Sequence, residues 1–237
     1  MQVKTKAIVI STLKFQDKSL IVKCFTQSNG LKSYFVRDAF SSRKSNQKIA
    51  YFQPLSLLEI EAVHKNKGTL EYFKEIKTAV AFQTIPLNIV KSTMVLFLSE
   101  ILHHAIQEEE KNENLFLYLE TALQWLDSHN EISNFHLIVM LEITRFLGFY
   151  PDTSASDLSY FEMSEGVFSA FHAISSLTAH QSYLLKTLLD LKLDSNEKVF
   201  HVIERQILLK ILIDYYSYHL DGFQKPKSLE VLKEIFS

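Results

Sequence analysis

The chain has 237 residues, of which 47% are apolar, and its formal net charge is −2. This length and this apolar content are sufficient for one large domain or two modest domains with buried cores. With only 5 Gly and 4 Pro, the chain has too few turn residues for a large β-sandwich, and the single Cys24 excludes an internal disulfide framework and a cysteine-based zinc cluster, so we expect a largely helical protein in a reducing compartment.

The charges are distributed unevenly along the sequence. The first 80 residues contain 14 Lys and Arg against 6 Asp and Glu, whereas the remaining 157 contain 11 against 21. A charge distribution of this kind attracts a polyanion to the amino-terminal part and repels it from the rest.

Alternation of apolar and polar residues predicts five short strands in the amino-terminal part. Asn29-Gly30 is a hairpin signal that offers a positive φ at both residues, and residues 38–53 form a basic segment without periodicity that we expect to be a loop. Five strands within about 80 residues predict a small closed barrel of the OB type. The expected strands cover residues 4–12, 19–26, 31–36, 55–63 and 69–82.

Beyond Pro86 the apolar residues recur every three or four positions, which is typical of helices. We therefore expect an α+β protein, with an OB-fold DNA-binding domain over residues 1–82 and an all-α helical domain over residues 83–237. Asp194 and Glu197 form a capping box that predicts the start of the last long helix. After a first helix beyond Pro86, the expected helices cover residues 112–127, 133–148, 168–176, 179–191 and 194–219, followed by a short one from residue 228.

The apolar runs are interrupted by polar residues well before the roughly 20 positions that a membrane-spanning helix needs. The amino terminus also lacks the apolar core of a signal peptide. We expect a cytoplasmic protein without membrane contact.

Motifs for catalysis are scarce. The sequence contains no G-x-S-x-G, no G-x-x-x-x-G-K and no G-x-G-x-x-G. Glu100 and His103 match the Glu-x-x-His element of di-iron helical bundles, but the second such element is missing, and a solvated polar face that also includes His104 and Glu108 is the simpler interpretation. We expect a non-enzymatic protein without a cofactor or a metal.

Aromatic and basic residues are interleaved in the expected barrel, as in proteins that bind single-stranded nucleic acids through stacking and phosphate contacts. Alternation places Tyr34 and Phe35 on opposite faces of a strand, and which of the two faces the core stays open. A solvated basic face is the alternative. The candidate DNA-binding residues are Lys14, Phe15, Lys18, Lys32, Tyr34, Arg37, Arg43, Lys44 and Lys48.

Two arginines of the helical part could serve a partner peptide. Arg145 lies three residues after Glu142 and can pair with it, or it can border a groove and bind a partner's carboxylate. Arg205 has the same two interpretations.

Several segments, in this order, resemble the bacterial recombination-repair family RecO over essentially the whole chain. In the amino-terminal part they are Lys6-Ala7-Ile8-Val9-Ile10, Asp17-Lys18-Ser19-Leu20-Ile21-Val22, Phe25-Thr26, Gly30 and Gln53-Pro54-Leu55. In the helical part they are Arg145-Phe146-Leu147-Gly148-Phe149-Tyr150-Pro151, Tyr215-Tyr216, His219-Leu220 and Lys227-Ser228-Leu229.

The resemblance implies an OB barrel joined to a helical domain, acting without catalysis. Proteins of this family bind single- and double-stranded DNA, anneal complementary strands, and work with the ring-forming RecR. They also bind the acidic carboxy-terminal tail of single-strand binding protein, so that recombinase can be loaded. The DNA face of the family corresponds here to Lys14, Lys18, Lys32, Arg37, Arg43 and Lys44, and Arg145 corresponds to a partner of the tail's carboxylate.

The chain departs from the family pattern at two places. Many relatives carry four zinc-binding cysteines just after the Leu-Gly-x-x-Pro segment, where residues 152–166 contain none. We expect a zinc-free lobe packed by Leu158, Tyr160, Phe161 and Phe168. Asp38 occupies a position where relatives tend to have Gly, and its negative charge would weaken a phosphate contact there.

A function of another class is also open. The basic barrel and a helical groove could dock protein partners rather than DNA, which would make the protein an interaction adaptor.

Overall fold

The computed structural model describes residues 1–40, 49–65, 70–106, 110–195 and 199–235. By its internal contacts the chain divides into two compact units, which we call unit 1 and unit 2. Unit 1 comprises residues 1–127 and 226–228, and unit 2 comprises residues 128–225 and 229–237.

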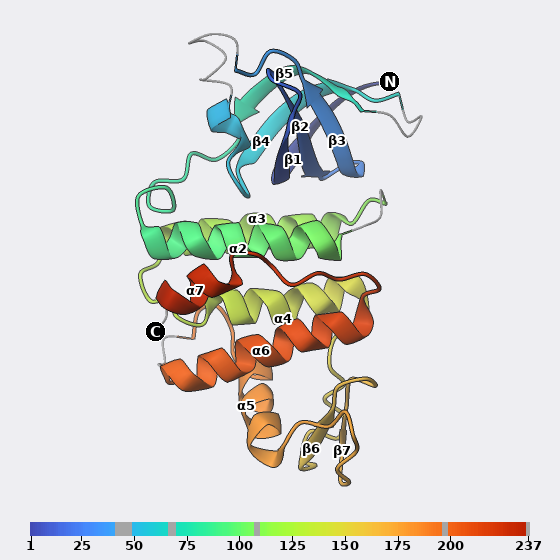
Figure 1. The fold of residues 1–237 in the computed structure, drawn as a ribbon, viewed down its shortest axis with the longest axis vertical. Helices are drawn as coiled ribbons and strands as arrows, with labels where there is room; N and C mark the ends of the chain where they lie inside the picture. Colours follow the sequence, from blue (N-terminus) through green and yellow to red (C-terminus); the bar gives the residue numbers. More distant parts are fainter. Residues whose placement is uncertain (41–48, 66–69, 107–109, 196–198, 236–237) are drawn as a thin grey trace. The chain divides into compact units, whose positions relative to one another are not determined.

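Unit 1 contains a five-stranded antiparallel sheet that is strongly twisted (Figure 1). Its strands lie in the order β3-β2-β1-β4-β5, so the expected five strands are confirmed. Their bounds are β1 Gln2–Phe15, β2 Ser19–Thr26, β3 Gly30–Val36, β4 Leu57–Val63 and β5 Tyr72–Thr78. A short 3₁₀ helix, η1 (Ala50–Phe52), precedes β4.

The expected closure of this sheet into a barrel is not found. Within the described residues no ladder joins β3 to β5, and the two edges meet at one isolated parallel bridge between Tyr34 and Glu71. Two backbone hydrogen bonds support the bridge, from Phe35 N to Glu71 O at 2.9 Å and from Glu71 N to Ser33 O at 2.8 Å. The fold is therefore an OB-type sheet whose last edge is held at a point.

The alternation of the strands builds a core on the inner face of the sheet. Side chains with no or almost no exposure gather there because successive residues of a strand point to opposite faces. They include Val9, Val22, Cys24, Tyr34, Phe52, Leu58, Ile60 and Ala62.

Two backbone conformations explain local sequence choices. Gly30 has a φ of 63° and follows the three-residue loop 27–29, so positive φ occurs there at Gly30 and not at Asn29, contrary to the expected two-residue turn. Asp38 has a φ of 52°, a conformation that Gly adopts freely and that Asp tolerates better than most residues. Gly would therefore meet the steric requirement at this position more easily than Asp does.

Helices α2 (Ile89–Ala105) and α3 (Glu113–Ser128) complete unit 1. Asn88 caps α2 by accepting hydrogen bonds from the backbone N–H groups of Val90 and Lys91. The Phe25 and Phe116 rings pack with their centroids 6.0 Å apart, and Lys6 forms an ion pair of 2.7 Å with the buried Glu120. Through these contacts α3 belongs to the same compact unit as the sheet.

Asp127, at the end of α3, fixes the connection between the sheet and the helices. Its carboxylate accepts hydrogen bonds of 2.8 to 2.9 Å from the backbone N–H groups of Gln83, Thr84 and Ile85. Burial alone would raise the pKa of Asp127, but these hydrogen bonds outweigh it and the net shift is downward. The segment that follows the sheet is therefore held within unit 1, which extends to Asp127. The expected domain division between residues 82 and 83 stays a prediction.

Unit 2 is built from helices α4 (Phe135–Leu147), α5 (Ala179–Leu189), α6 (Val202–His219) and α7 (Leu229–Ile235). Gly148 ends α4 with a φ of 86°, as expected of a carboxy-terminal cap. The start expected for α6 at Asp194 is wrong, because the helix begins at Val202 with His201 as its amino-terminal cap. The Glu197 of the expected capping box lies outside the described residues, whereas Glu204 Oε2 accepts a hydrogen bond of 2.8 Å from His201 N.

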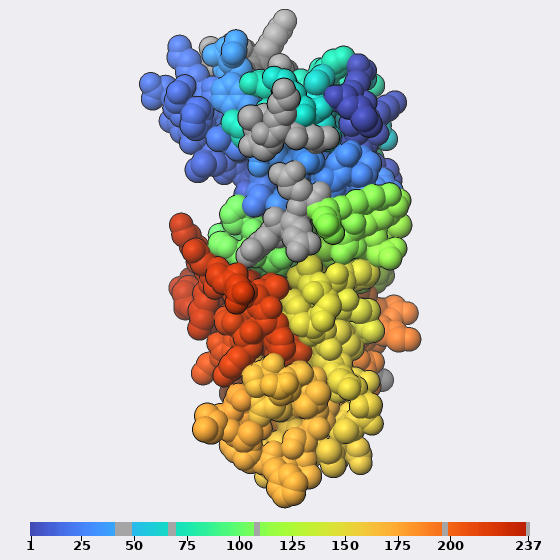
Figure 2. Space-filling model, turned by 90° about the vertical axis from the view of Figure 1, so that its right-hand side faces the viewer, coloured from blue at the N-terminus to red at the C-terminus, as the bar shows by residue number. Residues whose placement is uncertain are grey.

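The helix expected over residues 168–176 is also wrong, and unit 2 is not all-α. This segment contains a hairpin of β6 (Tyr160–Glu162) and β7 (Val167–Ser169). Figure 2 shows its orange-yellow residues packed as a continuous lobe. The expected packing by Leu158, Phe161 and Phe168 is confirmed, since all three contribute to one apolar cluster with Tyr215 of α6.

Glu162 ties this hairpin to the segment that follows it. Its carboxylate accepts hydrogen bonds from the hydroxyl groups of Ser164, Ser175 and Ser176, and these bonds, that from Ser175 above all, lower the pKa of Glu162 although its burial opposes the shift. Phe161 O also accepts a hydrogen bond of 2.8 Å from Leu177 N. A carboxylate and three hydroxyl groups thus organise the lobe.

None of the described helices is long and apolar enough to span a bilayer.

Candidate nucleic-acid interface

Three aromatic side chains cluster on the outer face of the sheet, and we call them the aromatic surface: Phe15, Phe35 and Tyr72. The rings of Phe15 and Phe35 lie 6.1 Å apart and those of Phe35 and Tyr72 lie 6.2 Å apart, both edge to face. Phe15 and Tyr72 are 39% and 43% exposed, and Phe35 is half-buried between them. Exposed ring faces in a row can stack nucleobases.

Tyr34 does not belong to this surface. Its side chain is 0% exposed, its ring stacks on Phe73 at 4.1 Å, and its hydroxyl group lies 2.8 Å from His64 Nε2. Burial raises the pKa of Tyr34, and Glu71 adds to this shift. Tyr34 could stack on a base only if the core opened, so its burial does not fit the expectation that it contacts DNA. Of the neighbours Tyr34 and Phe35, Phe35 is the one whose ring faces outward.

Of the expected cations, Lys14 and Lys32 lie on strands opposite the core residues Leu20 and Cys24, and Lys18 and Arg37 lie in turns. Lys14, Lys18 and Arg37 are exposed. Lys32 is half-buried, and its charge adds to the burial that lowers the pKa of His64. Lys14 points away from its neighbour Phe15 and lies over the Phe40 ring, with its Nζ 5.8 Å from the ring centroid. Arg43, Lys44 and Lys48 lie outside the described residues.

Lys65 joins the aromatic surface from the end of β4. Its Nζ lies 5.3 Å from the centroid of the Tyr72 ring, and its backbone N–H donates to the buried Glu71 at 2.8 Å. A cation beside a stacking face is the combination that single-strand binding requires. Sequence reasoning missed Lys65, Tyr72 and the role of Phe35. The isolated bridge between Tyr34 and Glu71, which brings Tyr72 to Phe35, joins residues far apart in the sequence.

The arginines of unit 2 have structural partners. Arg145 is exposed and donates to the carboxylate of Glu142, with its Nε 3.1 Å from Oε2, and its guanidinium carbon lies 3.7 Å from the centroid of the Tyr150 ring. The predicted pair with Glu142 is confirmed. Arg205 is half-buried and donates to Phe200 O at 2.7 Å, and burial lowers its pKa. Both side chains thus stabilise unit 2 locally.

Glu100 and His103 do not converge on a common point. Glu100 accepts hydrogen bonds from the backbone N–H and the hydroxyl group of Ser228, at 2.9 and 2.8 Å, whereas His103 Nδ1 lies 3.1 Å from Ser11 Oγ. In the described part of the chain no three His, Cys, Asp or Glu side chains are placed to hold a metal ion.

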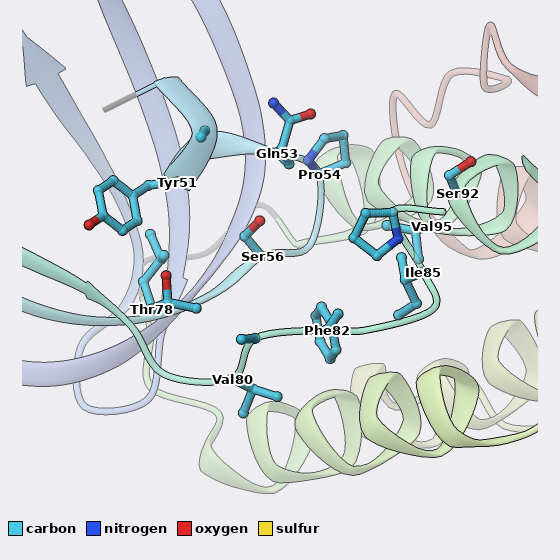
Figure 3. Close-up of a pocket in the computed structure, with 14 residues that line it drawn as sticks. Tyr51, Gln53, Pro54, Ser56, Thr78, Val80, Phe82, Ile85, Ser92 and Val95 are labelled. Carbon is cyan, nitrogen blue, oxygen red and sulfur yellow. The ribbon is translucent and has the colours of Figure 1, made fainter. Parts of the chain in front are cut away.

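Unit 1 also contains an apolar pocket of about 430 Å³. Tyr51 and Thr78 lie at one end and Ile85 and Val95 at the other, with Phe82 between them (Figure 3). None of the described residues that line it is charged. A pocket of this size and character suits an apolar group rather than a phosphate.

Comparisons with known proteins agree with each other. The family described as "Recombination protein O N terminal" matches residues 1–82, and "Recombination protein O C terminal" matches residues 86–230. The chain is 75% identical to the DNA repair protein RecO of Flavobacterium johnsoniae over 237 residues, and each chain is covered completely. It is 71% identical to that of Flavobacterium psychrophilum and 42% identical to that of Christiangramia forsetii, again with 100% of both chains covered.

Proposed function

Because this chain belongs to the RecO family, we propose that it is a non-catalytic DNA-binding mediator of recombinational repair. In this role it binds and anneals single strands and helps to load recombinase onto strands covered by single-strand binding protein. The relatives named DNA repair protein RecO support a role in DNA repair. The partners proposed with it are single- and double-stranded DNA, a RecR-like ring protein and the acidic tail of single-strand binding protein.

The observation that carries the proposal is the aromatic surface with a cation at its edge. Phe15, Phe35 and Tyr72 offer stacking faces on one side of the sheet, and Lys65 lies over the last of them. Lys14, Lys18 and Arg37 are exposed and lie close in the sequence to Phe15 and Phe35. They provide positive charge for the phosphates of a bound strand. Every base has a π-face and every nucleotide a negative charge, so such a surface binds single strands with little sequence preference.

The experiment is an anisotropy titration of a labelled single strand, with a matched duplex, at two salt concentrations. The wild type is compared with the triple variant Lys14→Ala/Lys18→Ala/Arg37→Ala and with the control Lys192→Ala/Lys210→Ala/Lys225→Ala in unit 2. We expect the first variant to bind more weakly and to lower the salt slope by about one for each phosphate that its cations no longer neutralise, and the control to bind like the wild type. An unchanged slope in the first variant would place the phosphate-binding cations elsewhere.

A second candidate function is favoured by the apolar pocket. The described residues that line it are uncharged and match a protein side chain better than a nucleic acid, which is what an interaction adaptor would need. Absence of DNA binding by the wild type even at low salt, together with partner capture that Val95→Asp abolishes, would favour the adaptor. Annealing of complementary strands by the purified protein would favour the mediator.

A further inference from the structure

A second group of polar side chains lies on the outer face of the sheet, at the bulge of β1. The register shifts between Val9 and Ser11, and Ser11 then pairs with Lys23 of β2. Val9 and Cys24 point into the core, so Ser11 and Lys23 lie on the opposite face. There Ser11 Oγ lies 3.1 Å from Nδ1 of His103, in the last turn of α2.

The charges in this group are not balanced within the described residues. Lys23 is half-buried, and no described carboxylate forms an ion pair with it. Burial lowers the pKa of Lys23. It also lowers the pKa of His103, as do the charges of Lys23 and His104, whereas Glu100 opposes the shift. A half-buried ammonium group that faces a histidine it repels is stabilised when an anion lies between them.

The neighbouring row of the same face is apolar and aromatic. Ile21, two residues before Lys23, pairs with Leu13 on one side and with Phe35 on the other. Adjacent residues on one face of a strand are about 7 Å apart. The polar row with Ser11 and Lys23 therefore runs beside an apolar row that ends in the aromatic surface. A single DNA strand that crosses the sheet can place its bases on the apolar row and a phosphate on the polar row.

We propose that Ser11, Lys23 and His103 form a phosphate subsite, and that it binds one backbone phosphate of a single strand stacked on the aromatic surface. The proposal rests on the function proposed above and adds a contact that ties the strand to α2. The ammonium group of Lys23 supplies the charge, and the Ser11 hydroxyl and the His103 ring supply two further donors.

The protonation state of His103 controls how many hydrogen-bond donors the subsite offers to a phosphate. In the neutral ring Nδ1 can accept from Ser11, which occupies the hydroxyl hydrogen. In the protonated ring Nδ1–H donates to Ser11 Oγ, and the hydroxyl hydrogen can turn to the phosphate. Binding therefore strengthens as the pH falls through the pKa that His103 has in the complex, because the bound phosphate favours the protonated ring. Among the described residues, the other titratable groups that act on this ring are Lys23, His104 and Glu100.

The test measures single-strand affinity at about pH 8 and pH 6, with ionic strength fixed, for Lys23→Met, His103→Gln and a control, His180→Gln in α5. We expect Lys23→Met to lower affinity by about tenfold and the salt slope by about one. We expect wild type and control to bind several-fold more tightly at the lower pH, and His103→Gln to lose this dependence. Wild-type affinity, slope and pH response in both variants would overturn the subsite.

A second measurement separates this proposal from the proposed function. The ring signals of His103 are followed by NMR as inorganic phosphate, and then the oligonucleotide, is added to the wild type. A rise in the pKa of His103 with phosphate supports the subsite even if no DNA is bound, in which case the proposed function alone fails. No rise with either ligand overturns the subsite, whatever the affinity for DNA.

Discussion

Tyr34 and Phe35 are neighbours in the sequence, yet they serve opposite faces of β3. Tyr34 packs on Phe73 in the core, and Phe35 lies between the rings of Phe15 and Tyr72 on the outer face. The same alternation separates Lys14, which lies over Phe40, from Phe15. At the scale of single residues, the side of the strand decides which aromatic ring can meet a base.

This separation predicts the effect of Tyr34→Phe. The substitution removes the hydroxyl group that lies 2.8 Å from His64 Nε2 and leaves a buried ring nitrogen without this partner. We expect the free energy of unfolding to fall by about 1 kcal/mol and single-strand affinity to stay unchanged. Urea unfolding and anisotropy titration check the two expectations, with the exposed Tyr183→Phe as control. A decrease in single-strand affinity without a decrease in stability would show that Tyr34 contacts DNA after all.

Alternation alone predicted that Tyr34 and Phe35 face opposite sides, but it could not say which is buried. The answer depends on which face of β3 meets Phe73 of β5, a contact between distant segments. Lys65 and Tyr72 were missed for the same reason, since they reach the aromatic surface through the bridge between Tyr34 and Glu71. The pair of Arg145 with Glu142 was predictable because it lies within one helix.

At the scale of elements, the hairpin of β6 and β7 lies where the family resemblance would place four zinc-binding cysteines, which this chain lacks. Phe161, Phe168 and Tyr215 supply its apolar packing, and Glu162 supplies its polar links. The serines that donate to Glu162 come from the turn of the hairpin and from the segment before α5. One carboxylate thus cross-links three parts of the lobe.

The effect of Glu162→Gln should depend on pH. Hydrogen bonds hold the pKa of Glu162 below its ordinary value of 4.5, so its ionised form stabilises the folded state above that pH, and this stabilisation is lost as the pH falls through the lower, folded value. We expect the substitution to cost about 1–2 kcal/mol near neutral pH and much less in acid. Thermal unfolding at both pH values checks this, with the exposed Glu165→Gln as control. An equal cost at both pH values would show that charge is not what links the lobe.

Most elements could be predicted from the sequence, because their periodicity and caps are local. The five strands and α3 with its Asn112 cap follow this rule. Two predictions failed in unit 2 for physical reasons. Residues 168–176 form no helix because Phe168 pairs with Phe161 across the hairpin. Helix α6 starts at Val202 because its cap, His201, forms a capping box with Glu204 there. The open sheet could not be foreseen either, since the contact between its edges is not encoded in any single strand.

At the scale of the whole molecule, the uneven charge is the property that the sequence shows most directly. The first 80 residues carry 14 cations against 6 anions, and the remaining residues carry 11 against 21. This asymmetry attracts a polyanion to the sheet and disfavours its contact with the acidic part of the chain. In the proposed function, charge would bring a DNA strand to the sheet, and the aromatic surface and the phosphate subsite would then fix its position.

The central claim is that a single strand stacks on the aromatic surface, and one measurement tests it most directly. It compares single-strand affinity at two salt concentrations for Phe15→Ala/Phe35→Ala/Tyr72→Ala and for a control that removes three exposed aromatic rings of unit 2, Phe171→Ala/Tyr183→Ala/Tyr218→Ala. Stacking contributes about 1–3 kcal/mol per base, so we predict at least a tenfold decrease in affinity in the first variant, with an unchanged salt slope because no charge is removed. The control should bind like the wild type. Equal affinities of the two variants would contradict the account.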